Sequence, residues 1–171
     1  MVNLKIFQTY YHSPLGWLKI EGVGSSLVSM DFVSKKAHDN SPLKVRRELD
    51  QYFRGKRKKF SLRLAPAGTL FQQKVWKALQ NISYGKRISY GEIAVKIGRR
   101  KSVRAVARAI GQNKLPIVIP CHRVVSADGS LTGYAYGLRK KAWLLHHEAG
   151  LKKVTARVTK PVSVRVTATS R

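Results

Sequence analysis

The sequence predicts an α+β protein in which a small, strand-rich N-terminal part precedes a larger, mainly helical C-terminal part. Two patterns support this prediction. Residues 4–33 contain β-rich runs separated by turn residues, whereas apolar residues from Leu70 onward recur at helical spacing. The chain has 171 residues, 43% of them hydrophobic, and can therefore bury a core. We expect a folded protein with two sub-domains.

Residues 1–62 form the predicted N-terminal sub-domain. The breakers Ser13–Gly16 and Gly22–Ser26 divide its first half into a meander of about three short strands. A helix is expected at Leu43–Phe53, where apolar residues are partly in helical phase. The basic run Arg54–Lys59 follows this helix, and we interpret it as a solvated linker between the two sub-domains.

Residues 63–150 are predicted to form the second domain, which begins with a helix. Phe71, Val75 and Leu79 recur every four residues and define a buried face, with Trp76 in the core beside it. A loop bounded by glycines, Thr132–Gly137, and a last helix, Leu138–His147, lie further along. In that last helix Leu138, Ala142 and Leu145 are in apolar phase.

Two short helices in the middle of this domain are joined by a basic turn. Ser89 and Glu92 have capping-box spacing, and the helix that they begin ends at Gly98. Ser102 is a second candidate N-cap, and the helix after it has apolar residues at helical spacing. Two short helices around a turn are typical of a helix-turn-helix. The apolar positions of the second helix are Val103, Val106, Ala107 and Ile110.

The charge balance is the most unusual property of the composition. The chain contains 34 Lys and Arg residues but only 8 Asp and Glu, which gives a net charge of +26. Such a chain favours a polyanionic partner: nucleic acid first, and an anionic membrane surface second. Arg104 and Arg108 share a face of the second short helix away from its apolar stripe, where a recognition helix would meet DNA. Residues 151–171 hold six Lys and Arg and no acid, and we expect a flexible polycation there.

Several classes of protein do not fit this sequence. It has no run of about 18 apolar residues, so no transmembrane helix is predicted. The N-terminus lacks the pattern of a secretory signal, and one cysteine forms no internal disulfide, so we expect a cytoplasmic protein. His146 and His147 are adjacent and point roughly 100° apart on a helix, so we predict no metal site.

The single cysteine, Cys121, lies in a distinctive setting. Pro116 and Pro120 bracket an apolar run directly before it and stiffen the approach. A thiol becomes a nucleophile when a base takes its proton, and the adjacent His122 and the more distant Glu148 offer a base and an orienting group. A buried cysteine at the end of an apolar strand is the alternative. The local sequence leaves both interpretations open.

A resemblance to a known family bears on this choice. The segment Pro120–Val124, PCHRV, resembles the active-site signature of the O6-alkylguanine-DNA alkyltransferases, which repair alkylated guanine and are consumed in the reaction. The resemblance covers roughly residues 5–150. It implies a ribonuclease H-like N-terminal sub-domain and a winged-helix-like second domain. Five further residues are in register with the family pattern: Tyr90, Arg104, Asn113, Tyr134 and Glu148.

The resemblance also implies a role for each matching residue. Arg104 would enter the duplex as the damaged nucleotide flips out, with the recognition helix in the minor groove. Glu148, His122 and a bridging water would take the proton of Cys121, while Asn113 forms the hinge before it. Tyr90 would donate to the purine. The implied pocket comprises Tyr90, Val124, Gly133, Tyr134, Ala135 and Tyr136, and the expected DNA contacts are Arg99, Arg100, Lys101, Ser102, Arg104, Arg108 and Arg123.

These expectations define a DNA-repair methyltransferase that acts once, as a monomer and without a cofactor, on double-stranded DNA containing O6-alkylguanine. Two positions in the pocket loop depart from the pattern. Ala135 stands where many relatives carry serine, and the bulky Tyr136 stands where some have glycine. We therefore expect a narrower pocket that disfavours large groups such as benzyl. The basic segment after Gly150 has no counterpart in the family core.

Three other functions are alternatives to DNA repair by alkyl transfer. A non-catalytic sensor of alkylated DNA would resemble the family but lack the cysteine, usually with tryptophan there, so Cys121 argues against it. A basic helix-turn-helix regulator with a buried cysteine would explain the charge, but not the register of the matching residues. A thiol hydrolase would need an oxyanion hole, and none is visible in the sequence.

Overall fold

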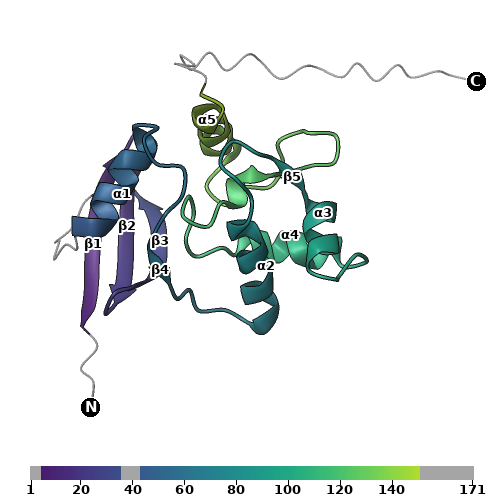
Figure 1. Ribbon diagram of the computed structural model, residues 1–171, viewed down its shortest axis with the longest axis horizontal. Helices are drawn as coiled ribbons and strands as arrows, with labels where there is room; N and C mark the ends of the chain where they lie inside the picture. The colour runs from purple at the N-terminus through teal and green to yellow at the C-terminus, as the bar shows by residue number, and fades with distance from the viewer. Residues whose placement is uncertain (1–4, 36–42, 151–171) are drawn as a thin grey trace, which may run out of the picture.

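The computed structural model of the chain describes residues 5–35 and 43–150 and shows a sheet-and-helix sub-domain beside a helical one (Figure 1). The predicted meander is confirmed as three antiparallel strands, β1 (Ile6–Ser13), β2 (Gly16–Val23) and β3 (Ser26–Val33). The first hairpin turns at Gly16, whose φ of +113° suits glycine. The Ser13 hydroxyl donates to the Gly16 carbonyl over 2.7 Å and closes the turn.

Helix α1 (Leu43–Phe53) has the predicted bounds and packs its buried residues Val45, Leu49 and Tyr52 into the core. A short strand, β4 (Arg63–Leu64), pairs parallel with β3 and gives the sheet order β1-β2-β3-β4. The sequence assigned residues 63 and 64 to the second domain. Their pairing with β3 places them in the first, because a two-residue edge strand has no periodicity to reveal it. The predicted tail, 151–171, lies outside the described residues.

Helix α2 (Leu70–Gln80) begins with a capping box between Thr69 and Gln72. Of the predicted apolar face, Val75 and Leu79 are buried and Phe71 is half-buried. Trp76 is 1% exposed, as expected for a core residue. Its indole Nε1 donates to the Ala109 carbonyl over 2.8 Å and ties α2 to the helix-turn-helix.

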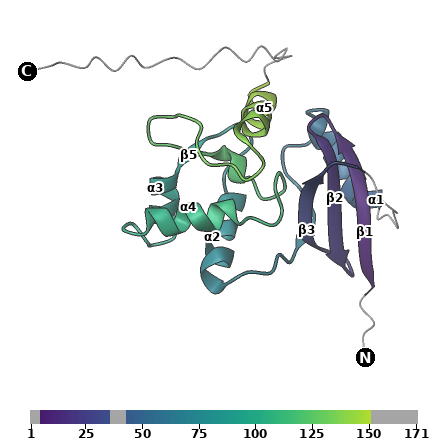
Figure 2. The ribbon, with the colours of Figure 1, turned by 180° about the vertical axis from the view of Figure 1, so that it is seen from behind.

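The predicted helix-turn-helix consists of α3 (Tyr90–Lys96) and α4 (Val103–Gly111), which follow the short strand β5 (Ile88–Ser89). The capping box of Ser89 and Glu92 is present. Ser102 occupies the N-cap position of α4, but its side chain makes no capping hydrogen bond. Figure 2 shows α3 and α4 at the side of the helical domain that faces away from the β-sheet.

The apolar run before Cys121 is a buried strap of turns, and not the apolar strand that the buried-cysteine alternative assumed. It leads into a 3-10 helix, η1 (Cys121–Arg123), and then into β6 (Val124–Val125), which pairs parallel with β5. The last helix is α5 (Leu138–Glu148). Its predicted apolar face is partly wrong, because Leu138 is 47% exposed. The residues of α5 that are buried are Lys141, Leu144, Leu145 and Glu148.

None of the helices in residues 5–35 and 43–150 is long and apolar enough to cross a membrane.

Candidate active site

Cys121 is held in place by the side chain of Asn113. The Asn113 amide Nδ2 donates to the Cys121 sulfur over 3.1 Å and to the Ile119 carbonyl over 2.9 Å. Its Oδ1 accepts from the Leu115 N–H over 3.0 Å, so every polar atom of the amide has a partner. Asn113 directly follows α4 and its C-cap, which couples the recognition helix to the thiol.

The thiol of Cys121 is 6% exposed, and this burial raises its pKa above the ordinary value. The hydrogen bond from Asn113 and the positive charge of Lys141 act in the opposite direction without cancelling it. The sulfur is therefore protonated at neutral pH and needs a base before it can act as a nucleophile.

His122, the candidate base, is fully buried. Its Nε2 lies 2.8 Å from Oε1 of Glu148. Burial lowers the pKa of His122, so the imidazole is neutral at pH 7. Because the ionised Glu148 only accepts hydrogen bonds, Nε2 carries the hydrogen and Nδ1 keeps its lone pair. Nδ1 is buried and has no protein hydrogen-bond partner within the described part of the chain.

Glu148 accepts hydrogen bonds from donors in three separate regions of the chain. Arg123 binds it with two parallel hydrogen bonds of 2.8 Å, and the Gly85 N–H donates over 3.1 Å. Tyr52 on α1 donates its hydroxyl over 2.7 Å. Burial alone would raise the pKa of Glu148, but the hydrogen bonds from His122 and Arg123 outweigh it and hold the pKa well below the ordinary value.

This network corrects the predicted role of Arg123. The sequence predicts Arg123 among the DNA contacts, but its side chain is buried and its guanidinium pairs with Glu148. A carboxylate removed from water needs a counter-charge and full hydrogen bonding, and Arg123 supplies both. Sequence alone does not show this, because Arg123 and Glu148 are 25 residues apart.

The predicted substrate pocket is built around two tyrosines that interact electrostatically with Cys121. The Tyr90 hydroxyl donates to the Thr132 carbonyl over 3.1 Å, and burial raises its pKa. The Tyr134 hydroxyl is buried without a hydrogen-bond partner in the described residues. Gly133 has a φ of +49°, and a Cβ there would lie 3.3 Å from the Tyr90 hydroxyl. Val124 is buried, whereas Ala135 is exposed.

The pocket loop is attached to the N-terminal sub-domain through Tyr136. Its hydroxyl donates over 3.0 Å to Oδ1 of Asp31, an exposed residue of β3. Its ring packs against Phe32 on the same strand, with 5.1 Å between centroids, and against Tyr134, with 5.7 Å. Asp31 and Tyr136 are 105 residues apart, so no local sequence pattern predicts this contact.

Lys141 on α5 lies at the candidate site, although the sequence did not predict it there. Its side chain is fully buried, and Nζ donates to the Thr132 carbonyl over 2.6 Å and lies 5.8 Å from the centre of the Tyr90 ring. No described acidic side chain pairs with it. Burial lowers the pKa of Lys141, and its interaction with Cys121 opposes this. One feature of the sequence could have indicated its burial: Lys141 has the spacing of a residue on the same helix face as Leu138 and Leu145.

The predicted DNA-contacting residues other than Arg123 lie together on the helix-turn-helix. Arg104 and Arg108 are exposed on α4, opposite its buried residues. No acidic side chain pairs with them within residues 5–35 and 43–150. The turn before α4 adds the exposed cations Arg99, Arg100 and Lys101 and the half-buried Ser102. In the same part of the chain, no cluster of three or more His, Cys, Asp or Glu residues is placed to hold a metal ion.

Comparison with known proteins agrees with this geometry. Residues 70–150 match the DNA-binding domain of 6-O-methylguanine DNA methyltransferase, and residues 6–66 match its ribonuclease-like domain. The methylated-DNA–protein-cysteine methyltransferase of Haemophilus influenzae is 42% identical over 84% of this chain and 86% of its own length. That of Methanosarcina barkeri is 44% identical over 80% of this chain and 92% of its own length.

Solved structures show the same likeness. The O6-methylguanine methyltransferase of Mycobacterium tuberculosis superposes with a TM-score of 0.79 at 37% identity, over 85% of this chain and 94% of that protein. A structure of the Mycobacterium tuberculosis protein in complex with DNA gives a TM-score of 0.76 at 40% identity, over 83% of this chain and 93% of that one. The α+β fold and its two predicted parts are thereby confirmed. This chain belongs to the 6-O-methylguanine DNA methyltransferase family.

Proposed function

We propose that the protein repairs double-stranded DNA by moving the alkyl group of O6-alkylguanine, mainly O6-methylguanine, onto Cys121. Two hydrogen bonds at adjacent residues carry the proposal: Asn113 donates to the Cys121 sulfur, and the next residue, His122, is paired with Glu148. The names of the relatives, methylated-DNA–protein-cysteine methyltransferase, support it. So does the relative solved with DNA. We place the protein in the cytoplasm, at the DNA, as a monomer.

DNA binding uses the exposed cations of α4 and the turn before it, which neutralise phosphates. The O6 atom of a stacked guanine is out of reach of a buried sulfur, so the nucleotide must leave the stack. Arg104 on α4 fills the gap that remains. The flipped base then enters between Tyr90 and Tyr134, and an ionised Cys121 raises the pKa of both tyrosines.

Alkyl transfer begins when Nδ1 of His122 takes the thiol proton of Cys121 through a water molecule. The thiolate attacks the alkyl carbon, and the S–C bond forms as the C–O6 bond breaks. The electron pair stays on guanine, which receives a proton from Tyr90, and the proton held by His122 restores the tyrosine through solvent. The thioether has no leaving group that water can displace, so each chain reacts once.

The proposal is tested with duplex DNA carrying one labelled O6-methylguanine. We expect label on the protein to rise to one methyl group per chain and stop, and Cys121→Ala to bind the same DNA without accepting label. Mass spectrometry should place the added methyl group on Cys121. Continued release of methanol would instead identify a hydrolase, and binding without transfer by the native chain would identify a sensor.

The Tyr136 position offers a test of substrate range. Tyr136 narrows the pocket while its hydroxyl and ring hold the loop on Asp31 and Phe32. We expect Tyr136→Gly to react with free O6-benzylguanine about tenfold faster or more, because a larger group then fits beside Tyr134. The measurement is the loss of methyl-transfer capacity with time of exposure to O6-benzylguanine.

Asp31→Ala separates the two effects of Tyr136, since it releases the tether but keeps the ring. An intermediate gain in the benzyl reaction would show that the N-terminal sub-domain controls the width of the pocket. Equal benzylguanine rates in the native chain and in Tyr136→Gly would contradict the narrow pocket.

A further inference from the structure

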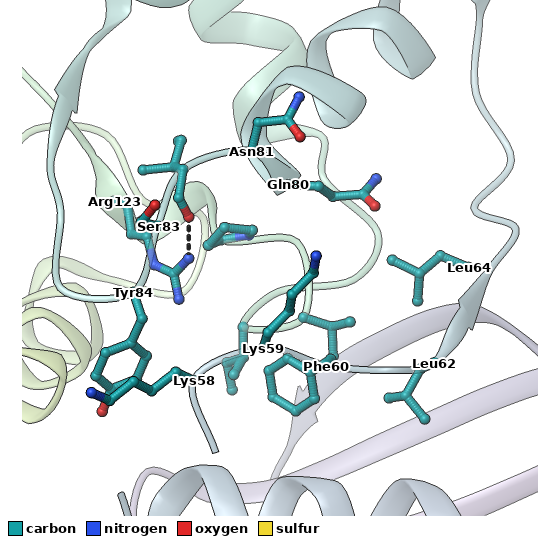
Figure 3. Close-up of a pocket in the computed structure, with 14 residues that line it drawn as sticks. Lys58, Lys59, Phe60, Leu62, Leu64, Gln80, Asn81, Ser83, Tyr84 and Arg123 are labelled. Atoms are coloured by element: carbon teal, nitrogen blue, oxygen red, sulfur yellow. Dashed lines mark hydrogen bonds between the residues drawn. The ribbon is translucent and has the colours of Figure 1, made fainter. Parts of the chain in front are cut away.

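A cleft of about 510 Å³ lies between the two sub-domains and is lined by residues of both. Its walls come from residues 58–64 after α1, from the end of α2 with the turn that follows, from the strap before Cys121, and from Arg123 of η1. Neither Cys121 nor any tyrosine of the alkylguanine pocket lines it, so the cleft is a separate space. Figure 3 shows Lys59 extending into this cleft, with Arg123 and Phe60 on different walls.

The charge in the cleft is entirely positive. Lys58 and Lys59, the last two residues of the basic run after α1, are exposed on its wall, and no described acidic side chain pairs with either. No Asp or Glu lines the cleft. Arg123 lines it as well and uses three N–H groups on Glu148 and the Ile82 carbonyl. Its other N–H groups have no protein acceptor in the part of the chain described.

The remaining walls suit a flat group with polar edges. Phe60 offers a half-buried aromatic ring and Leu62 extends the apolar surface, whereas the half-buried Tyr84 ring lies 5.8 Å from the Arg123 guanidinium. Asn81 and Ser83 line the same cleft as exposed polar residues, and their side chains make no hydrogen bond within the described chain. An aromatic base packs well on a ring such as that of Phe60, while amide and hydroxyl groups can pair with its edge.

We propose that this cleft binds a nucleoside phosphate. Its phosphate group lies on Lys59, which extends into the cleft, and its base lies against Phe60. A cavity of this size matches the range of small-molecule sites, which is roughly 300–1,000 Å³. The ligand is either a free nucleotide or one nucleotide of a nucleic acid strand. This site is independent of alkyl transfer, although Arg123 joins its wall to Glu148.

The test is equilibrium dialysis of the full chain at about 0.15 M salt, where surface charges are largely screened. Labelled AMP is compared with adenosine and with inorganic phosphate, and a 5′-phosphorylated tetrathymidylate represents a strand. We expect the nucleotide to bind at least tenfold more tightly than adenosine or phosphate. Tighter binding of the tetrathymidylate than of AMP would assign the site to a strand, and the reverse to free nucleotides.

The decisive variant is Lys58→Ala/Lys59→Ala, which should weaken AMP binding at least tenfold. Its matched control is Lys56→Ala/Lys86→Ala, which removes the same charge from positions outside the cleft and should leave binding unchanged. Phe60→Leu should weaken AMP binding but not phosphate binding. The proposal is overturned if both lysine pairs weaken AMP equally, if AMP binds no better than phosphate, or if Arg104→Ala abolishes AMP binding. Methyl transfer to Cys121 by the lysine variants shows that they are folded, and its absence from the native chain would refute the repair function alone.

Discussion

Arg123→Ala is expected to lower the free energy of unfolding by about 3–5 kcal/mol, because it leaves the buried Glu148 carboxylate without its counter-charge. The Tyr52 hydroxyl and the Gly85 N–H still donate to Glu148, but neither carries a positive charge. Alkyl transfer should fail as well, since a Glu148 that becomes protonated no longer orients His122. Denaturant unfolding and single-turnover transfer measure the two effects.

Two further variants show whether the ion pair is the cause. The double variant Arg123→Ala/Glu148→Gln should lose less stability than the sum of the single variants, because no isolated charge remains. Arg139→Ala removes an exposed arginine of α5 and should change stability little. Unchanged stability together with weaker DNA binding in Arg123→Ala would restore the surface role that the sequence suggested.

Lys141→Met should slow methyl transfer about tenfold or more while leaving stability unchanged or raised. The buried ammonium has no acidic partner in the described chain, so an apolar side chain of similar length removes a desolvation cost. The same charge lowers the pKa of Cys121 and therefore favours the thiolate. One pKa unit is a tenfold change in thiolate at neutral pH.

The reactivity of Cys121 toward iodoacetamide as a function of pH distinguishes this electrostatic role from a structural one. In Lys141→Met the reaction should require a higher pH, since loss of the positive charge raises the pKa of the thiol. Lys140→Met is the matched control, because Lys140 is half-buried over the Phe32 ring and shows no interaction with Cys121. A pH profile that does not move in Lys141→Met would contradict the role of its charge.

The local elements were predictable because their signals are local. Turn residues delimit β1, β2 and β3, and the 3.6-residue period and the capping boxes locate α1, α2 and α3. Elements without such signals were missed. The two-residue strand β4 is defined by its pairing with β3, and the strap before Cys121 has the composition of a strand but follows turns. Ile117 in that strap has a φ of +73°, which its sequence gives no reason to expect.

The candidate site divides in the same way. The order Cys121-His122 and the register of Asn113 and Glu148 are readable along the chain, and the structure brings these residues together. The residues that hydrogen-bond to the site and orient it lie far away in the sequence. Tyr52 reaches Glu148 across 96 residues, and Asp31 reaches Tyr136 across 105. The N-terminal sub-domain thus contributes directly to the geometry of the site.

The sequence by itself determined the family, the helix-turn-helix, the basic character and the candidate nucleophile, since each depends on residue type and short spacing. The tertiary structure decided how those residues are charged. Arg123 became the counter-ion of Glu148 instead of a phosphate contact, and Lys141, for which the sequence suggested no role, is a buried cation whose charge lowers the pKa of Cys121. Burial and the distance to an opposite charge govern ionisation, and both quantities exist only after the chain has folded.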